Sequence, residues 1–412
     1  MMRAEQNQCF TLGWTTQVNL LSAVTVIATC AVVARVGVVS LRSSPGKATY
    51  TPPAGSPAVP PLLPAADDPL EGWVDDWRVL MPSKRPIVCF LNRKGFLRAP
   101  PNTVTLRNFP GFHCNEVVYN GLTFENHTFH LLADATDDAI LRQLNRVRNS
   151  LFPHWRIIIN VFMDGVTAKS LHEPMLLDSL TAWLEQHRVH GINFEFDGDA
   201  FLGDLDSARD VVSFFAVARE DFRWANLSVS AMLPYGATAL FLGQLSTVLD
   251  RVFIKTHGLL DEPSGTTMLA APLDKAGLVH HTSNHHTIMN LLEDVDDHLT
   301  KRTCFTLSLA GTAFRLASPS QRGTSFSDLC RFVPDRIKKI EDDTAYTVEG
   351  DKWVTHEDQF TIFEKTAKVL RHWHFLCIGV VDVDMDDVRG ECGRVYPLLR
   401  RIYETSYILK YS

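Results

Sequence analysis

The chain has 412 residues, of which 45% are hydrophobic, and it carries a formal net charge of −7. This length accommodates a large single-domain core with appended segments, since α/β barrels alone need about 250 residues. The mild acidity, and the lack of a basic stripe with interleaved aromatic residues in the sequence, exclude a nucleic-acid-binding role.

The first apolar segment, residues 18–41, is interrupted only by Arg35. It is long enough to span the roughly 30 Å hydrocarbon core of a membrane as a signal-anchor helix, with Arg35 snorkelling near one end. It also fits a signal peptide that is cleaved after Ala34, because Val32 and Ala34 are small residues at the positions that signal peptidase reads. Both alternatives stay open, and an uncleaved segment would attach the protein to a membrane.

Residues 43–69 are dense in proline, alanine and serine. Such a segment tends to adopt extended polyproline conformations and does not bury a core, so it is predicted to be a linker. We therefore divide the chain into an N-terminal hydrophobic segment (1–42), a linker (43–84) and a folded domain (85–412).

From residue 85 onward, short apolar segments typical of strands alternate with helical segments such as MLLDSLTAWLEQH, which repeats apolar residues on one face. The predicted strands cover residues 86–92, 114–122, 155–163, 189–197, 227–235, 248–256, 304–311 and 375–384. Eight strands in strict alternation with helices predict a (β/α)8 TIM barrel, here with a small insertion after strand seven. In such barrels the active site lies at the carboxyl ends of the strands.

The predicted fourth strand contains HGINFEFDGD (190–199), in which Asn193, Glu195 and Asp197 project from one face. The segment LLDSLTAWLEQHRVHGINFEFD resembles the helix and fourth strand of glycoside hydrolase family 18, the chitinases and chitinase-like lectins, whose strand reads Asp-Gly-Ile-Asp-Ile-Asp-Trp-Glu. The segments IVCFLN, CNEVVYNGL, DKWVTHEDQFTIFEKTAKVL and VVDVDMDDVRGECGRVYPLL resemble other parts of that family in the same order. The resemblance covers roughly residues 85–404.

In that family a Glu protonates the glycosidic oxygen, while an Asp two residues earlier orients the acetamido group of the sugar, which itself attacks the anomeric carbon. The resemblance places Asp197 at the acid Glu, Glu195 at the orienting Asp and Asn193 at the Asp before it. Asp197 is one methylene shorter than Glu, and misplacing a catalytic proton by ~1 Å forfeits ~10²-fold in rate.

Other strands depart from the family pattern as well. His257 stands where the family has a Tyr that supports the acetamide, and Val381 stands where it has the Trp beneath the sugar. Phe162 is expected to fill space that the family leaves open. Changes on several strands at once indicate an abandoned catalytic pocket, in which Glu195 and Asp197 are expected to be solvated, or paired with each other and with neighbours such as Lys255.

The resemblance also implies ligand-contacting residues and disulfides. The substrate-binding candidates are Asn193, Tyr119, His257, Tyr235 and Asp382. The expected disulfides are Cys89–Cys114 and Cys330–Cys392. Cys304 and Cys377, on strands seven and eight, are expected to be buried core thiols.

Two N-glycosylation sequons, at Asn126 and Asn226, agree with the disulfides in favouring an oxidising compartment. We therefore expect a secretory-pathway protein, either extracellular or anchored in the type II orientation. No motif predicts a cofactor. The histidine-rich stretch 280–286 is interpreted as a polar loop rather than a metal site.

These observations predict a chitinase-like barrel without hydrolytic activity, which binds chitin-type N-acetylglucosamine glycans or a protein partner. The alternative is a weak or altered retaining hydrolase that acts on chitin with substrate assistance, with Asp197 as its acid and Glu195 assisting the acetamide.

Overall fold

The computed structural model describes most of the folded domain. The described residues are 85–99, 102–107, 109–124, 131–163, 171, 176–196, 205–234, 237, 239–257, 269, 271–272, 300–315, 318–324, 326, 329, 337–341, 344–391 and 393–409. The predicted N-terminal hydrophobic segment and the linker lie outside them, as do Asp197, Tyr235, Asn126, Cys330, Cys392 and the histidine-rich stretch 280–286.

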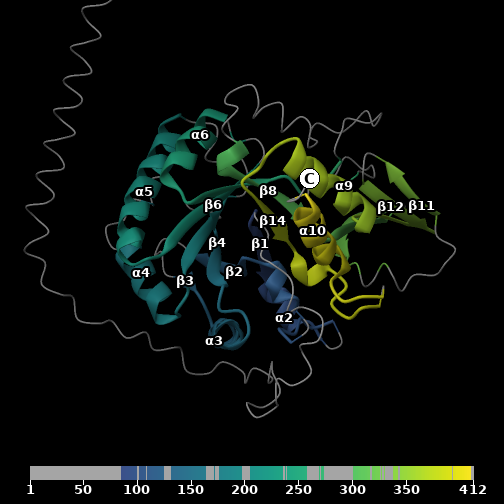
Figure 1. Ribbon diagram of the computed structural model, residues 1–412, viewed down its shortest axis with the longest axis horizontal. Coiled ribbons are helices and arrows are strands. Elements are labelled where there is room, and N and C mark those ends of the chain that lie inside the picture. The colour runs from purple at the N-terminus through teal and green to yellow at the C-terminus, as the bar shows by residue number, and fades with distance from the viewer. Residues whose placement is uncertain are drawn as a thin grey trace, which may run out of the picture. The chain divides into compact units, whose positions relative to one another are not determined.

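Eight parallel strands form a closed barrel (Figure 1). In sheet order they are β1 (Ile87–Asn92), β14 (Cys377–Val381), β8 (Thr303–Ser308), β7 (Arg251–Lys255), β6 (Ser228–Pro234), β5 (Gly191–Glu195), β4 (Arg156–Phe162) and β2 (Glu116–Phe124). Strand β1 pairs with both β14 and β2, which closes the sheet on itself. A short strand, β3 (Leu131–Leu132), adds to β2 in the antiparallel direction. The predicted (β/α)8 TIM barrel is confirmed, and each predicted strand overlaps an observed one.

Helices surround the barrel (Figure 1). They are α2 (Arg93–Leu97), α3 (Ala135–Ser150), α4 (Leu176–Gln186), α5 (Leu205–Trp224), α6 (Ala239–Val248), α9 (Gln359–Arg371) and α10 (Pro397–Ile408), with short 3-10 turns at Gly111–His113, Thr300–Arg302 and Val383–Met385. Helix α3 begins where it does because the Asp134 side chain accepts hydrogen bonds from the backbone of Thr136 and Asp137. Within the described residues, no helix is long and apolar enough to cross a membrane.

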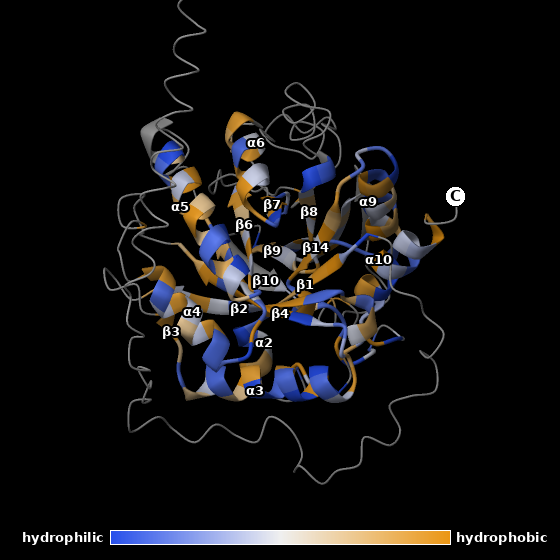
Figure 2. Cartoon of the chain, turned by 60° about the vertical axis from the view of Figure 1, so that its left-hand side comes forward, coloured by the Kyte–Doolittle hydropathy of each residue, from blue (hydrophilic) through white to orange (hydrophobic). Residues whose placement is uncertain are grey.

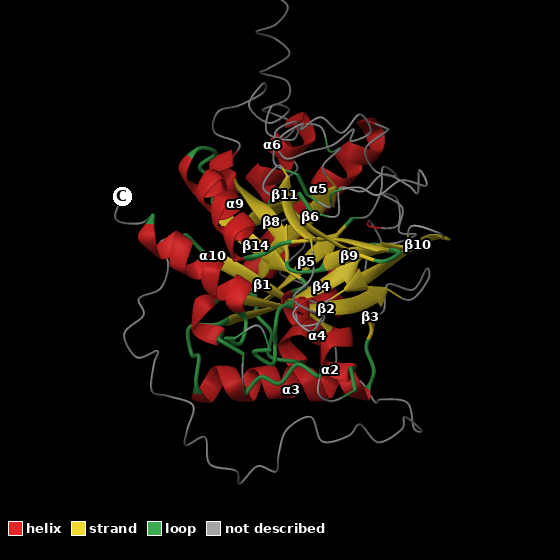
Figure 3. Ribbon diagram, turned by 90° about the vertical axis from the view of Figure 1, so that its right-hand side faces the viewer, coloured by secondary structure: helices red, strands yellow, loops and turns green. Residues whose placement is uncertain are grey.

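A second, antiparallel sheet lies in the chain between β8 and α9 (Figure 3). Its order is β10 (Ser318–Thr324), β9 (Gly311–Arg315), β13 (Lys352–His356), β12 (Thr344–Glu349) and β11 (Ile337–Glu341). Because β8 is the seventh barrel strand, this small sheet is the predicted insertion. It places β9 and β13 beside the carboxyl ends of β8 and β14.

The barrel strands alternate between two apolar layers, and Figure 2 shows the hydrophobic colouring along β1 and β14. Ile87 and Leu91 of β1 belong to the layer beneath the helices, whereas Val88 and Phe90 belong to a smaller cluster inside the barrel. Phe90 crosses the interior to contact Phe253 of β7, with ring centroids 5.4 Å apart. The sequence pattern therefore places odd and even positions on opposite faces, as a pleated strand requires.

Gly191, at the start of β5, is required by close packing rather than by an unusual dihedral angle. A Cβ atom at this position would lie 2.3 Å from the backbone oxygen of Ser228 on β6. The glycine of the stretch HGINFEFDGD thus allows two barrel strands to approach each other.

Two disulfides occur among the described residues. Cys89 and Cys114 are bonded as expected, linking β1 to the segment before β2. The expectation that Cys304 and Cys377 are free thiols is wrong, because they form the second disulfide. These residues face each other directly in the β8–β14 register, with Cα atoms 4.6 Å apart. The sequence predicts that the two cysteines lie on neighbouring strands, but it does not predict a disulfide between them. Only the strand register shows that they oppose each other.

The Cys304–Cys377 disulfide is expected to stabilise the barrel strongly. It joins positions 73 residues apart, and the loop-entropy relation assigns about 4 kcal/mol to a closed loop of that size. Replacing both cysteines with serine should lower the free energy of unfolding by that order, measured by urea denaturation under oxidising conditions. A double variant with an unchanged denaturation midpoint would contradict this prediction. Reducing the wild type should cost more than this, because reduction also breaks the Cys89–Cys114 disulfide.

Candidate functional site

The carboxyl ends of the barrel strands enclose a ladder of asparagine side chains. Asn193 of β5 donates to Asn160 of β4 (2.6 Å), Asn160 donates to Asn120 of β2 (2.8 Å), and Asn120 donates to Asn92 of β1 (2.7 Å). Ser230 of β6 extends the ladder by donating to the Asn193 carbonyl oxygen at 2.8 Å. Asn160 and Asn193 are fully buried, so these hydrogen bonds replace the contacts with water that the amides lose.

Glu195 lies at the end of β5 and is held on two sides. One carboxylate oxygen accepts a hydrogen bond from the Asn160 amide at 2.7 Å, and the other lies 3.5 Å from the ammonium group of Lys255 on β7. The whole residue is only 7% exposed. The expected pairing of Glu195 with Lys255 is confirmed, and the carboxylate is therefore part of a buried network.

The network continues beyond Asn92 to two carboxylates that follow β14. The Asn92 amide donates to Asp382 and to Asp384, at 2.8 Å each. Ser308 at the end of β8 donates to the second oxygen of Asp382 at 2.6 Å. Side chains from seven barrel strands and from the residue after the eighth are thus joined in one network.

Asp382 and Asp384 differ in their surroundings. Asp384 is buried and forms an ion pair with Arg98. Burial raises the pKa of the Asp384 carboxyl above its ordinary value, and the Arg98 guanidinium opposes that shift. Asp382 is only half-buried and adopts a left-handed backbone conformation, with φ of 55° and ψ of 40°. This strained conformation turns the chain at the barrel mouth.

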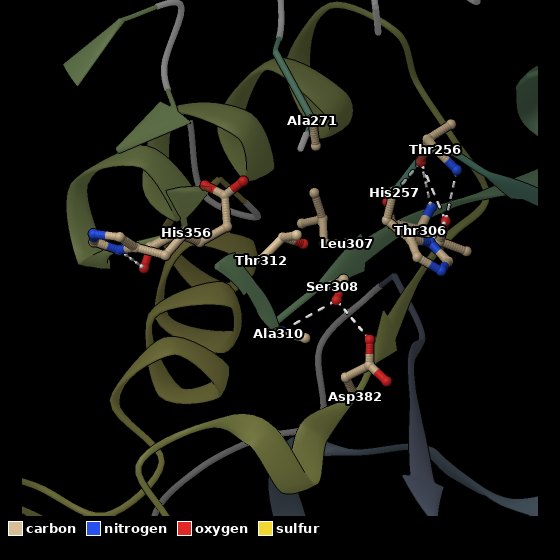
Figure 4. Close-up of a pocket in the computed structure, with 11 residues that line it drawn as sticks. Thr256, His257, Ala271, Thr306, Leu307, Ser308, Ala310, Thr312, His356 and Asp382 are labelled. Carbon is tan, nitrogen blue, oxygen red and sulfur yellow. Dashed lines mark hydrogen bonds between the residues drawn. The ribbon is translucent and has the colours of Figure 1, made fainter. Parts of the chain in front are cut away.

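A cavity of about 140 Å³ opens between the barrel mouth and the small sheet (Figure 4). Ser308 and Asp382 line its barrel side, and His257, which follows β7, lies against Thr306 with its Nδ1 atom 2.8 Å from the threonine hydroxyl. Glu357, just after β13, lines the side of the small sheet. The cavity therefore collects hydrogen-bonding groups from both parts of the domain.

Glu357 is anchored by a buried ion pair. Lys365 of α9 is completely buried, and its ammonium group contacts Glu357 and donates to the Thr344 hydroxyl at 3.1 Å. Thr361 donates to the other Glu357 oxygen at 2.7 Å. Burial raises the pKa of the Glu357 carboxyl, while the charge of Lys365 opposes that shift. The pair fixes α9 to the small sheet beside the cavity.

The structure brings together four of the predicted site residues, Asn193, Glu195, His257 and Asp382, at the carboxyl end of the barrel. The expectation that Tyr119 contacts a ligand there is wrong. Tyr119 faces the helix layer, is fully buried, and donates its hydroxyl to Asp137 of α3 at 2.5 Å. Tyr119 is one residue before the inward-facing Asn120, so strand parity settles which of the two reaches the mouth.

Several site residues were missed from the sequence. Asn92, Asn120 and Asn160 each lie near the carboxyl end of a predicted strand, and their common inward parity was a usable signal. Asp384 offered the same signal, because it ends the predicted strand 375–384 with the parity of Asp382, whereas Glu357 offered none, because its role depends on α9. Among the described residues, no group of three or more histidine, cysteine, aspartate or glutamate side chains is arranged to hold a metal ion.

Comparison of the sequence with known proteins gives weak similarity. No protein-family model matches the chain. A putative chitinase of Pinctada maxima is 25% identical over 107 residues, which are 24% of this chain and 23% of that protein. Putative chitinase 1 of Margaritifera margaritifera is 32% identical over 83 residues, which are 19% of this chain and 18% of that protein. The matched region thus spans about a fifth of the length of these curated relatives.

Comparison with solved structures gives a much more extensive similarity. A group IV chitinase of Ostrinia furnacalis superposes with a TM-score of 0.68 at 14% identity, covering 78% of this chain and all of that one. Human YKL-39, described as a pseudo-chitinase with retained chitooligosaccharide binding properties, gives 0.66 at 16% identity, covering 78% and 99%. The chain therefore has the (β/α)8 barrel fold of the chitinases and chitinase-like proteins that its sequence resembles.

Removing only one partner of the Glu357–Lys365 pair is expected to be far more damaging than removing both. Lys365→Met leaves a carboxylate buried without its cation, which costs about 3–5 kcal/mol in the free energy of unfolding. The double variant Glu357→Gln, Lys365→Met should recover most of this loss. As a control, Arg315→Met removes an exposed ion pair to Asp351 and should cost less than about 1 kcal/mol. Urea denaturation measures all three variants, and equal costs for the single and double variants would refute the analysis.

Proposed function

We propose that this protein binds chitin-type N-acetylglucosamine oligosaccharides at the carboxyl ends of its barrel strands and does not hydrolyse them. The observation that carries the proposal is the pairing of Glu195 with both Asn160 and Lys255. Human YKL-39, which has a similar fold, is described as a pseudo-chitinase with retained chitooligosaccharide binding properties. This similarity supports oligosaccharide binding without hydrolysis in the present protein.

The pairing of Glu195 argues against substrate-assisted hydrolysis on electrostatic grounds. In that mechanism, positive charge develops at the anomeric carbon and on the acetamide that attacks it, and a carboxylate beside the acetamide stabilises this charge. At the corresponding position Glu195 is already bonded to the Asn160 amide, and Lys255 adds a cation 3.5 Å away. That cation raises the energy of a positively charged transition state.

Binding is compatible with the same geometry. The cavity beside Asp382 presents a carboxylate, the Ser308 hydroxyl and the His257 imidazole, which suit the hydroxyl and acetamide groups of a sugar. Val381, which stands where the family has the Trp beneath the sugar, is buried inside the barrel. Affinity should therefore depend on polar contacts more than on stacking.

We also propose that the protein enters the secretory pathway. The Cys89–Cys114 and Cys304–Cys377 disulfides support this, because such bonds persist in oxidising compartments. The sequon residue Asn226 is exposed between α5 and β6, where it is accessible to a glycan. A cleaved signal peptide and a type II anchor are both consistent with these observations.

Wild-type protein should show no turnover of a fluorogenic chito-oligosaccharide between pH 4 and 8 above that of the Asp197→Ala variant. Titration calorimetry with chitotetraose should nevertheless detect binding. Turnover that disappears in Asp197→Ala would contradict the proposal and establish a weak retaining hydrolase with Asp197 as its acid. If neither turnover nor binding is detected, the proposed ligand is wrong and a protein partner becomes the better candidate.

Asp382→Asn is expected to weaken chitotetraose binding about tenfold, because a hydrogen bond from a sugar hydroxyl to a charged acceptor is replaced by one to a neutral acceptor. The substitution keeps the side-chain size and suits the left-handed backbone. Asp351→Asn is the matched control, since Asp351 lies on the surface of the small sheet and pairs with Arg315. Equal affinities for the two variants would place the ligand elsewhere.

A further inference from the structure

The amino ends of the barrel strands, opposite the candidate site, hold three adjoining cavities. Their volumes are about 500, 280 and 760 Å³. The first and second share Asn226 and Leu227 as lining residues, whereas the second and third share Asn145, Asn149 and Arg188. The three hollows therefore form one continuous surface at the ends of β4, β6 and β7 and of helices α3, α4 and α5.

Arginines gather in the first cavity. Arg156 and Arg251 are the first residues of β4 and β7, and both approach Glu116 at the start of β2. Arg219 and Arg223, on the last two turns of α5, also line this cavity. Glu116 offsets part of the charge of the two strand arginines, and the α5 arginines remain on the exposed rim.

The other two cavities carry the same charge. Arg142 and Arg146 of α3 line the largest cavity, Arg148 lines the middle one, and Arg188 lines both. Across the three cavities, eight arginines face four carboxylates. One of those carboxylates, Asp138, lies 2.9 Å from His187. This strongly positive surface occurs on a chain whose net charge is −7.

Three of these arginines have no structural role that the described residues reveal, and a fourth, Arg223, lies in the last turn of α5, where a cation stabilises the helix. The side chains of Arg142, Arg146, Arg188 and Arg223 are exposed, and none forms an ion pair or hydrogen bond with another described residue. Cations do stabilise the carboxyl ends of helices, but that effect is confined to about the last turn. Arg142 lies two turns before the end of α3, so helix stabilisation does not account for it.

We propose that the arginine face, formed by Arg142, Arg146, Arg188 and Arg223 with the cavities that they line, binds a sulfated polysaccharide. Guanidinium groups bind oxyanions through paired hydrogen bonds, and a row of them matches a chain that carries sulfate groups at intervals. Three shallow hollows in succession suit an extended ligand better than a single compact anion.

The lining residues favour this ligand over other polyanions. Single-stranded nucleic acids are held by aromatic side chains on which bases stack, and the described lining of the three cavities contains no Phe, Tyr or Trp. A membrane surface is recognised by a convex basic helix with an apolar face, whereas this surface is hollowed. A polysaccharide needs neither stacking nor apolar insertion, because its sulfates supply the interaction.

The test compares two arginine pairs of equal charge in the full-length protein. Arg188→Gln, Arg223→Gln alters the arginine face, and Arg315→Gln, Arg394→Gln removes two exposed arginines that line none of the three cavities. Asn226 is a sequon residue that lines two of the cavities. All proteins therefore also carry Asn226→Gln, so that a glycan at this position does not affect the comparison. Binding to a heparin oligosaccharide and to its desulfated form is measured by titration calorimetry at several NaCl concentrations, with the melting temperature recorded for each variant.

We expect heparin binding that weakens steeply with salt, is lost on desulfation, and falls about tenfold only in the Arg188, Arg223 variant. The melting temperature should not change. Equal losses in both variants would show non-specific charge attraction and overturn the proposal. So would binding that survives desulfation, or tighter binding to single-stranded DNA or to phosphatidylserine vesicles. Because the candidate sugar site lies at the other end of the barrel, chitotetraose binding should be the same in both variants.

Discussion

The need to satisfy buried polar groups inside a closed barrel is the constraint on which the site depends. Asn120, Asn160 and Asn193 point into the interior from neighbouring strands, where water does not replace a missing hydrogen bond. Each amide both donates and accepts, so the three side chains form a ladder that Asn92 and Ser230 extend. The strand register fixes this ladder, because a shift of one residue would turn every amide outward. The polar layer therefore specifies the barrel as well as lining its mouth.

Much of this architecture could be predicted from the sequence. The alternation of apolar strands with amphipathic helices gave the barrel, and the parity of Asn193 and Glu195 put both side chains inside it. What failed depended on register or on distant contacts. Tyr119 was assigned to the mouth although its neighbour Asn120 has the inward parity. The Cys304–Cys377 disulfide required knowing which residues of two adjacent strands oppose each other, and no local pattern contains that information.

The arginine face likewise could not be predicted from the sequence. A search along the sequence finds no basic stripe, because its arginines are dispersed between positions 142 and 251. They converge because helices and strands alternate in direction, which brings the carboxyl ends of α3, α4 and α5 to the amino ends of the strands. The two ends of the barrel consequently differ in charge, with Asp382 and Asp384 at one end and arginines at the other. Overall composition averages over this difference and conceals it.

The Glu195–Lys255 pair shows how the barrel accommodates a buried carboxylate at the end of β5. A carboxylate that is 7% exposed requires hydrogen bonds and a cation, and Asn160 with Lys255 provides them. Replacing Glu195 alone with Asp would shorten the side chain and draw its carboxylate away from Lys255. Changing Lys255 alone would leave Glu195 buried with less compensation. The two positions are therefore energetically coupled, and a change at either one alone is expected to cost more than a matched change at both. This coupling makes the arrangement at the end of β5 resistant to single substitutions.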